Sequence, residues 1–214
     1  MPSELRHSIL LNTGRLAGFA IAAAIILSLV YALTETRITN QMLAAQRQAL
    51  NSIFPASEHD NDLISDSFII DINSSEYSNL ELLGLRENSH AYVARKNMQP
   101  SGLILPFVAR DGYNGDIDLL LGVSIEGLVT GLRVTAHRET PGLGDLIDLR
   151  VSDWILSFNN RSLVNPELSG WTVRKNAGVF DQFTGATITP RAVTVATAKA
   201  LEFFEENKSR LLSL

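Results

Sequence analysis

The chain has 214 residues, of which 45% are hydrophobic, and it carries a formal net charge of −5 with no cysteine. That length supports one domain of moderate size with a buried core. The lack of cysteine excludes disulfides, thiolate zinc or iron–sulfur sites, c-type haem and a cysteinyl flavin bond. There is no cluster of Lys and Arg that would neutralise phosphates, and the four histidines lack metal-ligand spacing, so we predict neither a nucleic-acid partner nor a metal site.

An uncharged apolar segment lies near the N-terminus. Residues 16–33 read LAGFAIAAAIILSLVYAL and contain no charged side chain. Because about 20 apolar residues cross the hydrocarbon core of a bilayer, we predict a transmembrane helix at residues 16–34. A cleaved signal peptide is the alternative, since Val30-Tyr31-Ala32 offers small residues near a possible cleavage site. The apolar cores of signal peptides usually run about 7–15 residues, which favours the membrane anchor.

The charges around this segment bear on its orientation. Arg6 and Arg15 precede it and favour a cytoplasmic N-terminus at residues 1–15, whereas Arg37 and Arg47 follow it and weaken that bias. We predict that the N-terminus lies inside and that the bulk of the chain is exported. A signal peptide would export the same bulk.

The rest of the chain predicts a linking helix and one domain. Apolar residues recur at three- and four-residue intervals from Ile38 to Ile53, which predicts a linking helix over residues 35–55. Residues 56–214 form the predicted exterior domain, of class α+β, with an antiparallel sheet and flanking helices. The expected strands are 68–72, 91–94, 102–109, 171–174 and a hairpin over 115–136 that turns at Glu126-Gly127, and the expected helices are 146–158 and 190–208.

A polar motif precedes the last predicted helix. It reads Asp181-Gln182-Phe183-Thr184-Gly185-Ala186-Thr187-Ile188-Thr189 and is followed by Pro190. Threonine before proline is a common helix start, so Thr189 is the predicted N-cap and Pro190 the first helical residue. The hydroxyl of Thr187 is then not needed for the cap, and it lies next to a helix N-terminus that favours a phosphate. By itself the motif also fits an ordinary capped loop that enters a helix.

Three segments resemble one protein family. The threonine motif resembles the Asp-x-x-Ser/Thr-Gly-Ala-Thr pattern of the FMN-binding domains in Rnf-type electron transport complexes and sodium-pumping NADH:quinone reductases. Residues 137–144, His-Arg-Glu-Thr-Pro-Gly-Leu-Gly, resemble the family's segment His-x-Glu-Thr-Pro-Gly-Leu-Gly. Asp111-Gly112-Tyr113-Asn114-Gly115 also resembles the RnfG version of the domain, whereas residues 57–100 match no motif.

The resemblance implies a covalent flavoprotein. In the family, a flavin transferase that uses FAD and magnesium esterifies FMN to the last threonine of the motif, here Thr187, and releases AMP. The chain would be an electron-carrier subunit, non-catalytic alone, of an Rnf-type complex in the bacterial inner membrane, with its FMN domain on the periplasmic side. Its partners would be the other subunits of that complex, which couples electron transfer between ferredoxin and NAD to cation transport.

The same resemblance predicts a pocket for the flavin ring. Glu139 and Thr140 are expected to hydrogen-bond the polar edge of the ring, and Gly142 and Gly144 to let the backbone approach it. The full set of predicted cofactor-binding residues is Asp181, Thr184, Gly185, Ala186, Thr187, Glu139, Thr140, Pro141, Gly142, Leu143 and Gly144. Two alternatives stay open, namely the homologous FMN-binding subunit of a sodium-translocating NADH:quinone reductase and a membrane-anchored adaptor without flavin.

Overall fold

The computed structural model describes residues 3–213, with side chains from residue 10 onward. The chain divides into two compact units, residues 1–46 and residues 47–214. One helix, α1 (Ser3–Ile53), runs through the first unit and contributes its last residues to the second. The segments predicted as transmembrane and linking helices are therefore continuous. Residues 1 and 2 of the predicted N-terminal segment lie outside the described residues.

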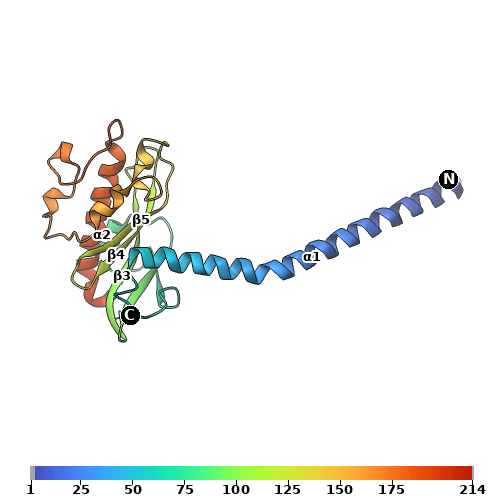
Figure 1. Ribbon diagram of the computed structural model, residues 1–214, viewed down its shortest axis with the longest axis horizontal. Coiled ribbons are helices and arrows are strands. Elements are labelled where there is room, and N and C mark those ends of the chain that lie inside the picture. The colour runs from blue at the N-terminus through green and yellow to red at the C-terminus, as the bar shows by residue number, and fades with distance from the viewer. Residues whose placement is uncertain (1–2, 214) are drawn as a thin grey trace. The chain divides into compact units, whose positions relative to one another are not determined.

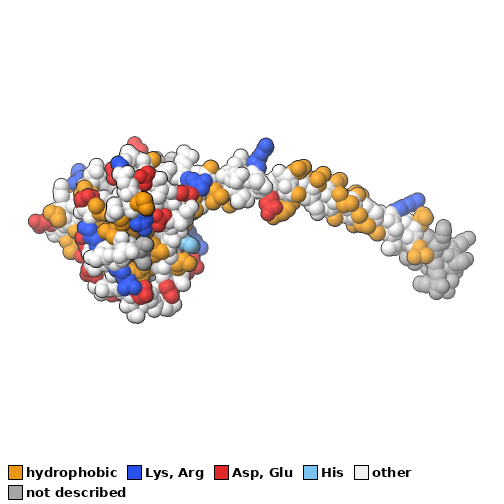
Figure 2. Space-filling view, turned by 90° about the horizontal axis from the view of Figure 1, so that it is seen from below, with side chains coloured by type: hydrophobic (Ala, Val, Ile, Leu, Met, Phe, Trp, Pro, Cys, Tyr) orange, Lys and Arg blue, Asp and Glu red, His pale blue; other side chains and the backbone are white. Residues whose placement is uncertain are grey.

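The apolar segment of α1 exposes its side chains all along its length. Ile25 is 62% exposed and Leu27 is 69% exposed. Figure 2 shows these hydrophobic side chains along the helix, with charged side chains at either end of the segment. By length and composition, α1 is the one helix among the described residues that could cross a membrane. Such a surface is unfavourable in water and suits a lipid environment, and the membrane span itself stays a prediction.

Five strands form an antiparallel sheet in the second unit. In chain order and in sheet order they are β1 (Ser67–Ile70), β2 (Ser89–Lys96), β3 (Gln99–Ala109), β4 (Ile117–Ser124) and β5 (Val129–Ala136). The pairing of β3 with β4 runs without interruption from Gly102↔Ser124 to Ala109↔Ile117. The strands predicted between residues 68 and 136 are confirmed, and β2 and β3 are longer than predicted. Neighbours in sequence are neighbours in the sheet, as short connections favour.

The helix α2 (Ile188–Leu211) covers one face of the sheet (Figure 1). Its buried residues Val193, Phe203 and Phe204 belong to one core with Phe107 of β3 and Leu119 of β4. Every second side chain of a strand points to the same face, so the alternating apolar residues of β4 all reach this core. Burying one such side chain stabilises the fold by about 1.5–3 kcal/mol. This layer of helix on sheet is the main core of the domain.

The opposite face of the sheet holds the end of α1 in a trough made by three glycines. Gly122 on β4 lies directly across from Gly131 on β5, and Gly102 lies on β3. A Cβ at Gly131 would lie 2.5 Å from the Ile53 carbonyl oxygen, and one at Gly102 would lie 2.4 Å from the Phe54 ring. The chain at the end of α1 can therefore approach the sheet this closely only because these positions lack side chains. We call Gly102, Gly122 and Gly131 the glycine trough.

Two side chains of β5 cap the last carbonyl groups of α1. The Thr130 hydroxyl donates to the Ile53 carbonyl at 2.9 Å, and the Arg133 guanidinium donates to the Ser52 carbonyl at 2.8 Å. The last carbonyl groups of a helix have no partner inside the helix, so these bonds satisfy groups that would otherwise need water. The last turn of α1 is thus bonded to the sheet as well as packed against it.

The predicted helix at residues 146–158 is wrong. This region forms two short 3-10 helices, η2 (Gly144–Ile147) and η3 (Asp153–Phe158). Between them the Asp148 carboxylate accepts from the Arg150 backbone N–H at 2.9 Å. The Ser152 hydroxyl donates to the Leu146 carbonyl at 2.6 Å. Local side-chain bonds of this kind compete with the helical hydrogen-bond pattern, which the apolar periodicity could not reveal.

The predicted strand at residues 171–174 is also wrong. Val173 makes a single bridge to Phe180, and the chain then enters the 3-10 helix η5 (Arg174–Asn176). Aromatic packing fixes the segment instead, because the Phe180 ring stacks on Phe158 at 4.4 Å and contacts Trp171 at 5.3 Å between ring centroids. Two further 3-10 helices are η1 (Leu80–Leu83) and η4 (Leu168–Gly170).

The glycine trough predicts a steric effect of substitution. Gly131→Ala would place a methyl group 2.5 Å from the Ile53 carbonyl oxygen, so the end of α1 has to shift. We expect a loss of about 1–3 kcal/mol in the free energy of unfolding, as for other overpacked sites. Chemical denaturation of the full chain in detergent measures it. Gly14→Ala is the matched control, since a Cβ there meets nothing within 4 Å, and equal stability of the two variants would contradict the prediction.

An ion pair at the end of α1 predicts a pH effect. The Arg47 guanidinium donates to Asp62 at 2.8 Å and lowers the pKa of that carboxyl from 3.8 to about 2. Because the pKa is lower in the folded protein, the pair stabilises the fold above about pH 4 and loses its effect as pH falls towards 2. The free energies of unfolding of wild type and Asp62→Asn should differ by a constant amount from pH 5 to 7 and converge below pH 4. A difference that is as large at pH 2.5 as at pH 6 would exclude this pair as its source.

Candidate functional site

The threonine motif forms a tight turn that leads into α2. The Ala186 N–H donates to the Phe183 carbonyl at 3.1 Å, and Gly185 takes a positive φ of 82° in the turn between them. Thr187 stands at the cap position of α2. The residue is half-buried, and its hydroxyl makes no hydrogen bond to any residue that the structure describes. The turn thus presents a free hydroxyl beside the helix N-terminus.

The predicted cap assignment of Thr189 is wrong. Helix α2 begins at Ile188, so Thr189 is the second helical residue and Pro190 the third. Thr189 is fully buried, and its hydroxyl donates to a carboxylate oxygen of Glu139 at 2.5 Å. The Thr189 hydroxyl therefore bonds to Glu139, a residue distant in sequence, and does not cap the helix as the sequence suggested. Proline is still acceptable here, because the first turn of a helix leaves its N–H groups unpaired.

A pocket of about 230 Å³ brings the two predicted segments together. Thr187 lines it, and so do residues from the loop that follows β5 and from the first turn of α2. The lining residues are Tyr113, Glu139, Thr140, Leu143, Gly144, Gly185, Ala186, Thr187, Ile188 and Thr189. Seven of them belong to the predicted binding set: Glu139, Thr140, Leu143, Gly144, Gly185, Ala186 and Thr187.

Four predicted binding residues lie outside the lining of this pocket, namely Pro141, Gly142, Asp181 and Thr184. Asp181 is exposed and pairs with Arg174 at 3.0 Å, while its backbone carbonyl accepts from the Trp154 indole at 2.8 Å. Thr184 is exposed on the turn. Asp181 and Thr184 are therefore accessible to another protein, which fits recognition of the motif better than contact with a ligand inside the pocket.

Glu139 is the most connected polar side chain of the site. It is 5% exposed. One carboxylate oxygen accepts from the Thr189 hydroxyl, and the other accepts from the Asn114 N–H at 3.0 Å. The side-chain amide of Asn114 also donates, through Nδ2, to the Thr140 hydroxyl at 3.1 Å. Glu139 thus bonds to the protein with both oxygens, whereas the sequence suggested a contact with the flavin ring.

A second carboxylate, that of Asp148, lies near the same loop on the far side of His137. The Glu139 N–H donates to Nδ1 of His137 at 3.1 Å, and Nε2 of the same ring lies 3.8 Å from a carboxylate oxygen of Asp148. The pKa of Asp148 is lowered, chiefly by the hydrogen bond from the Arg150 guanidinium. His137 therefore has a structural role between the loop and Asp148.

Three lining residues were not among the predicted binding residues, namely Thr189, described above, Tyr113 and Ile188. Tyr113 is 65% exposed and Ile188 is 40% exposed, and both flank the pocket. Tyr113 lies in the segment of residues 111–115, whose resemblance to the family was noted without a role. The sequence signal that could have indicated its place at the pocket is an aromatic residue between two glycines, Gly112 and Gly115. Nothing in the sequence pattern showed that Ile188 would turn towards the pocket.

The residues of this pocket fit a phosphate ester with a partly exposed ring. The backbone N–H groups of Thr187, Ile188 and Thr189 have no acceptor among the described residues, as expected at a helix N-terminus. Gly185 and Ala186 leave space beside the free hydroxyl of Thr187. Pockets for small-molecule ligands usually measure about 300–1,000 Å³. A pocket of about 230 Å³ would therefore enclose only part of an FMN molecule.

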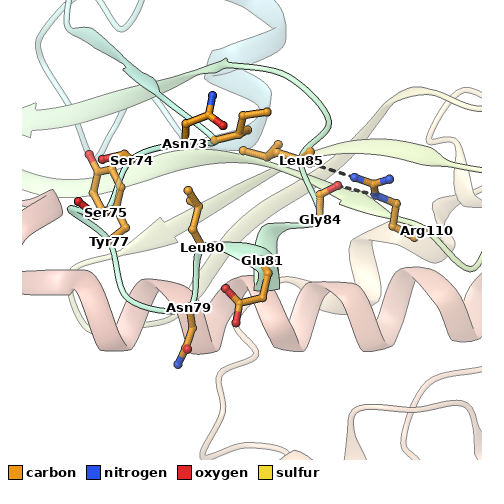
Figure 3. A pocket seen from close by; sticks show the side chains of 11 residues that line it. Asn73, Ser74, Ser75, Tyr77, Asn79, Leu80, Glu81, Gly84, Leu85 and Arg110 are labelled. Carbon is orange, nitrogen blue, oxygen red and sulfur yellow. Dashed lines mark hydrogen bonds between the residues drawn. The ribbon is translucent and has the colours of Figure 1, made fainter.

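A larger depression lies elsewhere, in the segment that matched no motif (Figure 3). Ten residues between Ile72 and Leu85 line it together with Arg110, and none of the threonine motif does. The Arg110 guanidinium donates to the Gly84 and Leu85 carbonyl groups at 2.7 and 2.9 Å, so its charge is already engaged. Among the described residues there is also no group of three or more His, Cys, Asp or Glu that could hold a metal ion. The pocket at Thr187 is the candidate site, because it brings the two predicted segments together.

Comparison with known proteins places this geometry in a family. The FMN-binding domain profile matches residues 112–202, and the RnfG N-terminal region matches residues 1–53. The G-type subunit of the ion-translocating oxidoreductase complex of Vibrio cholerae El Tor is 43% identical over 92% of this chain and 90% of its own length. Its counterpart from Pseudomonas aeruginosa PAO1 is 43% identical over 100% of this chain and 96% of its own. The chain belongs to the RnfG family of ion-translocating oxidoreductase complexes.

Membership in the RnfG family confirms the resemblance seen in the two motifs. The FMN-binding domain match encloses the pocket, because it spans both the loop at residues 137–144 and the threonine motif. The crystal structure of Shewanella oneidensis NqrC is also similar, with a TM-score of 0.46 and 20% identity over 72% of this chain and 76% of that one.

Proposed function

We propose that this protein is the membrane-anchored electron carrier of an ion-translocating oxidoreductase complex, with FMN attached through a phosphoester to Thr187. The observation that carries the proposal is the free Thr187 hydroxyl at the start of α2, in the lining of a pocket inside the FMN-binding domain. The unpaired N–H groups of the first turn would bind the phosphate, and the helix dipole favours its negative charge.

Attachment requires an enzyme that this chain does not supply. A flavin transferase would use the exposed motif with Asp181 and Thr184 as its recognition surface, since both side chains are accessible. The chain is the substrate in that step, and it has no catalytic role alone. The flavin would supply exchange of one or two electrons, while the protein binds it, positions it and sets its environment.

The shallow pocket suits a relay. A ring that is only partly enclosed keeps an edge open to a partner's redox centre, whereas an enzyme for a small substrate would surround its ligand. Tyr113 and Leu143 would border the ring, and Thr140 would offer it a hydroxyl. We infer that the partners are the other subunits of the complex, which would couple electron transfer between ferredoxin and NAD to cation transport. The relatives from ion-translocating oxidoreductase complexes favour this function over a place in a sodium-translocating quinone reductase.

Flavin attachment has a direct test. The full chain is co-expressed with a flavin transferase and run on a denaturing gel under ultraviolet light. We expect a fluorescent band for wild type and none for Thr187→Ala, because only the Thr187 hydroxyl is free at the helix start. Thr184→Ala is the matched control within the motif and should keep most of the fluorescence. Fluorescence that survives Thr187→Ala, or its absence from the wild-type band, would refute the proposal.

The exterior position of the domain can be tested because the natural chain has no cysteine. We propose that residues 16–34 span the membrane and that residues 56–214 lie on the periplasmic side. In intact cells with a permeabilised outer membrane, an impermeant maleimide should label Ser75→Cys, since Ser75 is exposed, and should label Ser3→Cys only after lysis. The opposite pattern would reverse the orientation. A mature protein that begins after Ala32 would instead establish a cleaved signal peptide.

A further inference from the structure

We propose that Glu139 is the positioning residue of the flavin site: its buried carboxylate fixes the presentation of Thr187, and its negative charge lowers the reduction potential of the FMN attached there. This inference rests on the proposed function and goes beyond it, because it assigns the control of attachment and of potential to one side chain that would not itself bond to the cofactor.

The Glu139 carboxylate connects the two sides of the pocket. Glu139 lies on the loop after β5, and its two oxygens reach two other segments, the β3–β4 connection at Asn114 and the first turn of α2 at Thr189. Thr187 precedes Thr189 by two residues in the same turn. A backbone shift that displaces Thr189 therefore also displaces the Thr187 hydroxyl, to which the flavin would be attached. The bond to Asn114 holds the loop that carries Tyr113 on the other side of the pocket.

The surrounding backbone reserves space for this carboxylate. A Cβ at Gly144 would lie 2.6 Å from one Glu139 oxygen and 3.0 Å from the Thr189 hydroxyl oxygen. A Cβ at Gly112 would lie 2.1 Å from the Gly115 carbonyl oxygen and 3.0 Å from the other Glu139 oxygen. Gly144 thus makes room for the Glu139 carboxylate and also lines the pocket, whereas Gly112 chiefly makes room for the turn of its own loop. The sequence suggested that Gly144 serves the approach of the ring alone.

The charge of Glu139 is not neutralised by a basic partner. Glu139 is 5% exposed, and no ion pair with Lys or Arg is found for it within the described part of the chain. It lines the same pocket as Thr187. A charge in such a site is screened less than one in water, so its field acts on nearby groups. Reduction adds electrons to the cofactor, and a neighbouring carboxylate disfavours the added negative charge. The carboxylate therefore lowers the potential.

One substitution separates charge from position. In Glu139→Gln, the amide oxygen can accept from the Asn114 N–H, and the NH₂ group can donate to the Thr189 hydroxyl, which accepts as well as donates. The variant therefore keeps both contacts and loses the charge. We expect a higher midpoint potential in a spectroelectrochemical titration of the flavinylated full chain, compared with wild type at equal flavin content. A midpoint potential equal to that of wild type would overturn the role of the charge.

A second pair of substitutions tests position. Thr189→Val removes the donor to Glu139, and Thr189→Ser restores it. We expect the initial rate of attachment by purified flavin transferase and FAD to fall about tenfold to hundredfold in Thr189→Val, as for other misplaced reacting groups, and to recover in Thr189→Ser. Glu139→Ala should be slowed similarly. Circular dichroism and thermal melting identify the folded variants.

The result that would overturn the positional role is a folded Thr189→Val protein that is flavinylated at the wild-type rate. Failure of this inference is distinguishable from failure of the proposed function. If wild type acquires fluorescence, Thr187→Ala does not, and the Glu139 and Thr189 variants behave as wild type, the flavin site stands and only the role of Glu139 is refuted. If wild type acquires no flavin, the proposed function itself fails.

Discussion

The hydrogen bond from the Thr189 hydroxyl to the Glu139 carboxylate holds together the part of the molecule that carries its chemistry. Both groups are buried, so neither can exchange its partner for water without an energetic cost. The bond joins the start of α2 to a loop that has little regular structure. It adds a buried polar link between the two motifs that line the pocket. The site is thus organised by a tertiary contact between residues 50 positions apart.

This contact also explains where prediction from the sequence succeeded and where it failed. The strands between residues 68 and 136 and the course of α2 follow from repeating apolar patterns, which are local. The pairing of the two motifs followed from their resemblance to a family. The role of Thr189 could not be predicted in this way, because a threonine before a proline fits a helix cap equally well. The sequence does not show that a carboxylate from another loop accepts a hydrogen bond from its hydroxyl.

The region after β5 was mispredicted for a related reason. Its apolar spacing suits a helix, but Asp148 and Ser152 bond to nearby backbone groups and divide the segment into two short pieces. Apolar periodicity carries no information about such competing bonds. Tyr113 was missed because exposure at a pocket rim depends on how the β3–β4 connection folds, and one contact of that connection is the bond from the Asn114 N–H to Glu139, far along the chain.

The glycine trough has a consequence for how a carrier could work. Because the last turn of α1 is packed and bonded to the sheet, the junction at residues 52–54 is a stiff coupling rather than a flexible tether. In the proposed carrier, motion at this junction would therefore add little to the volume that the attached flavin explores. Any swinging of the domain between two partners would have to arise N-terminal to Arg47. The length and stiffness of that stretch would then set the rate of exchange.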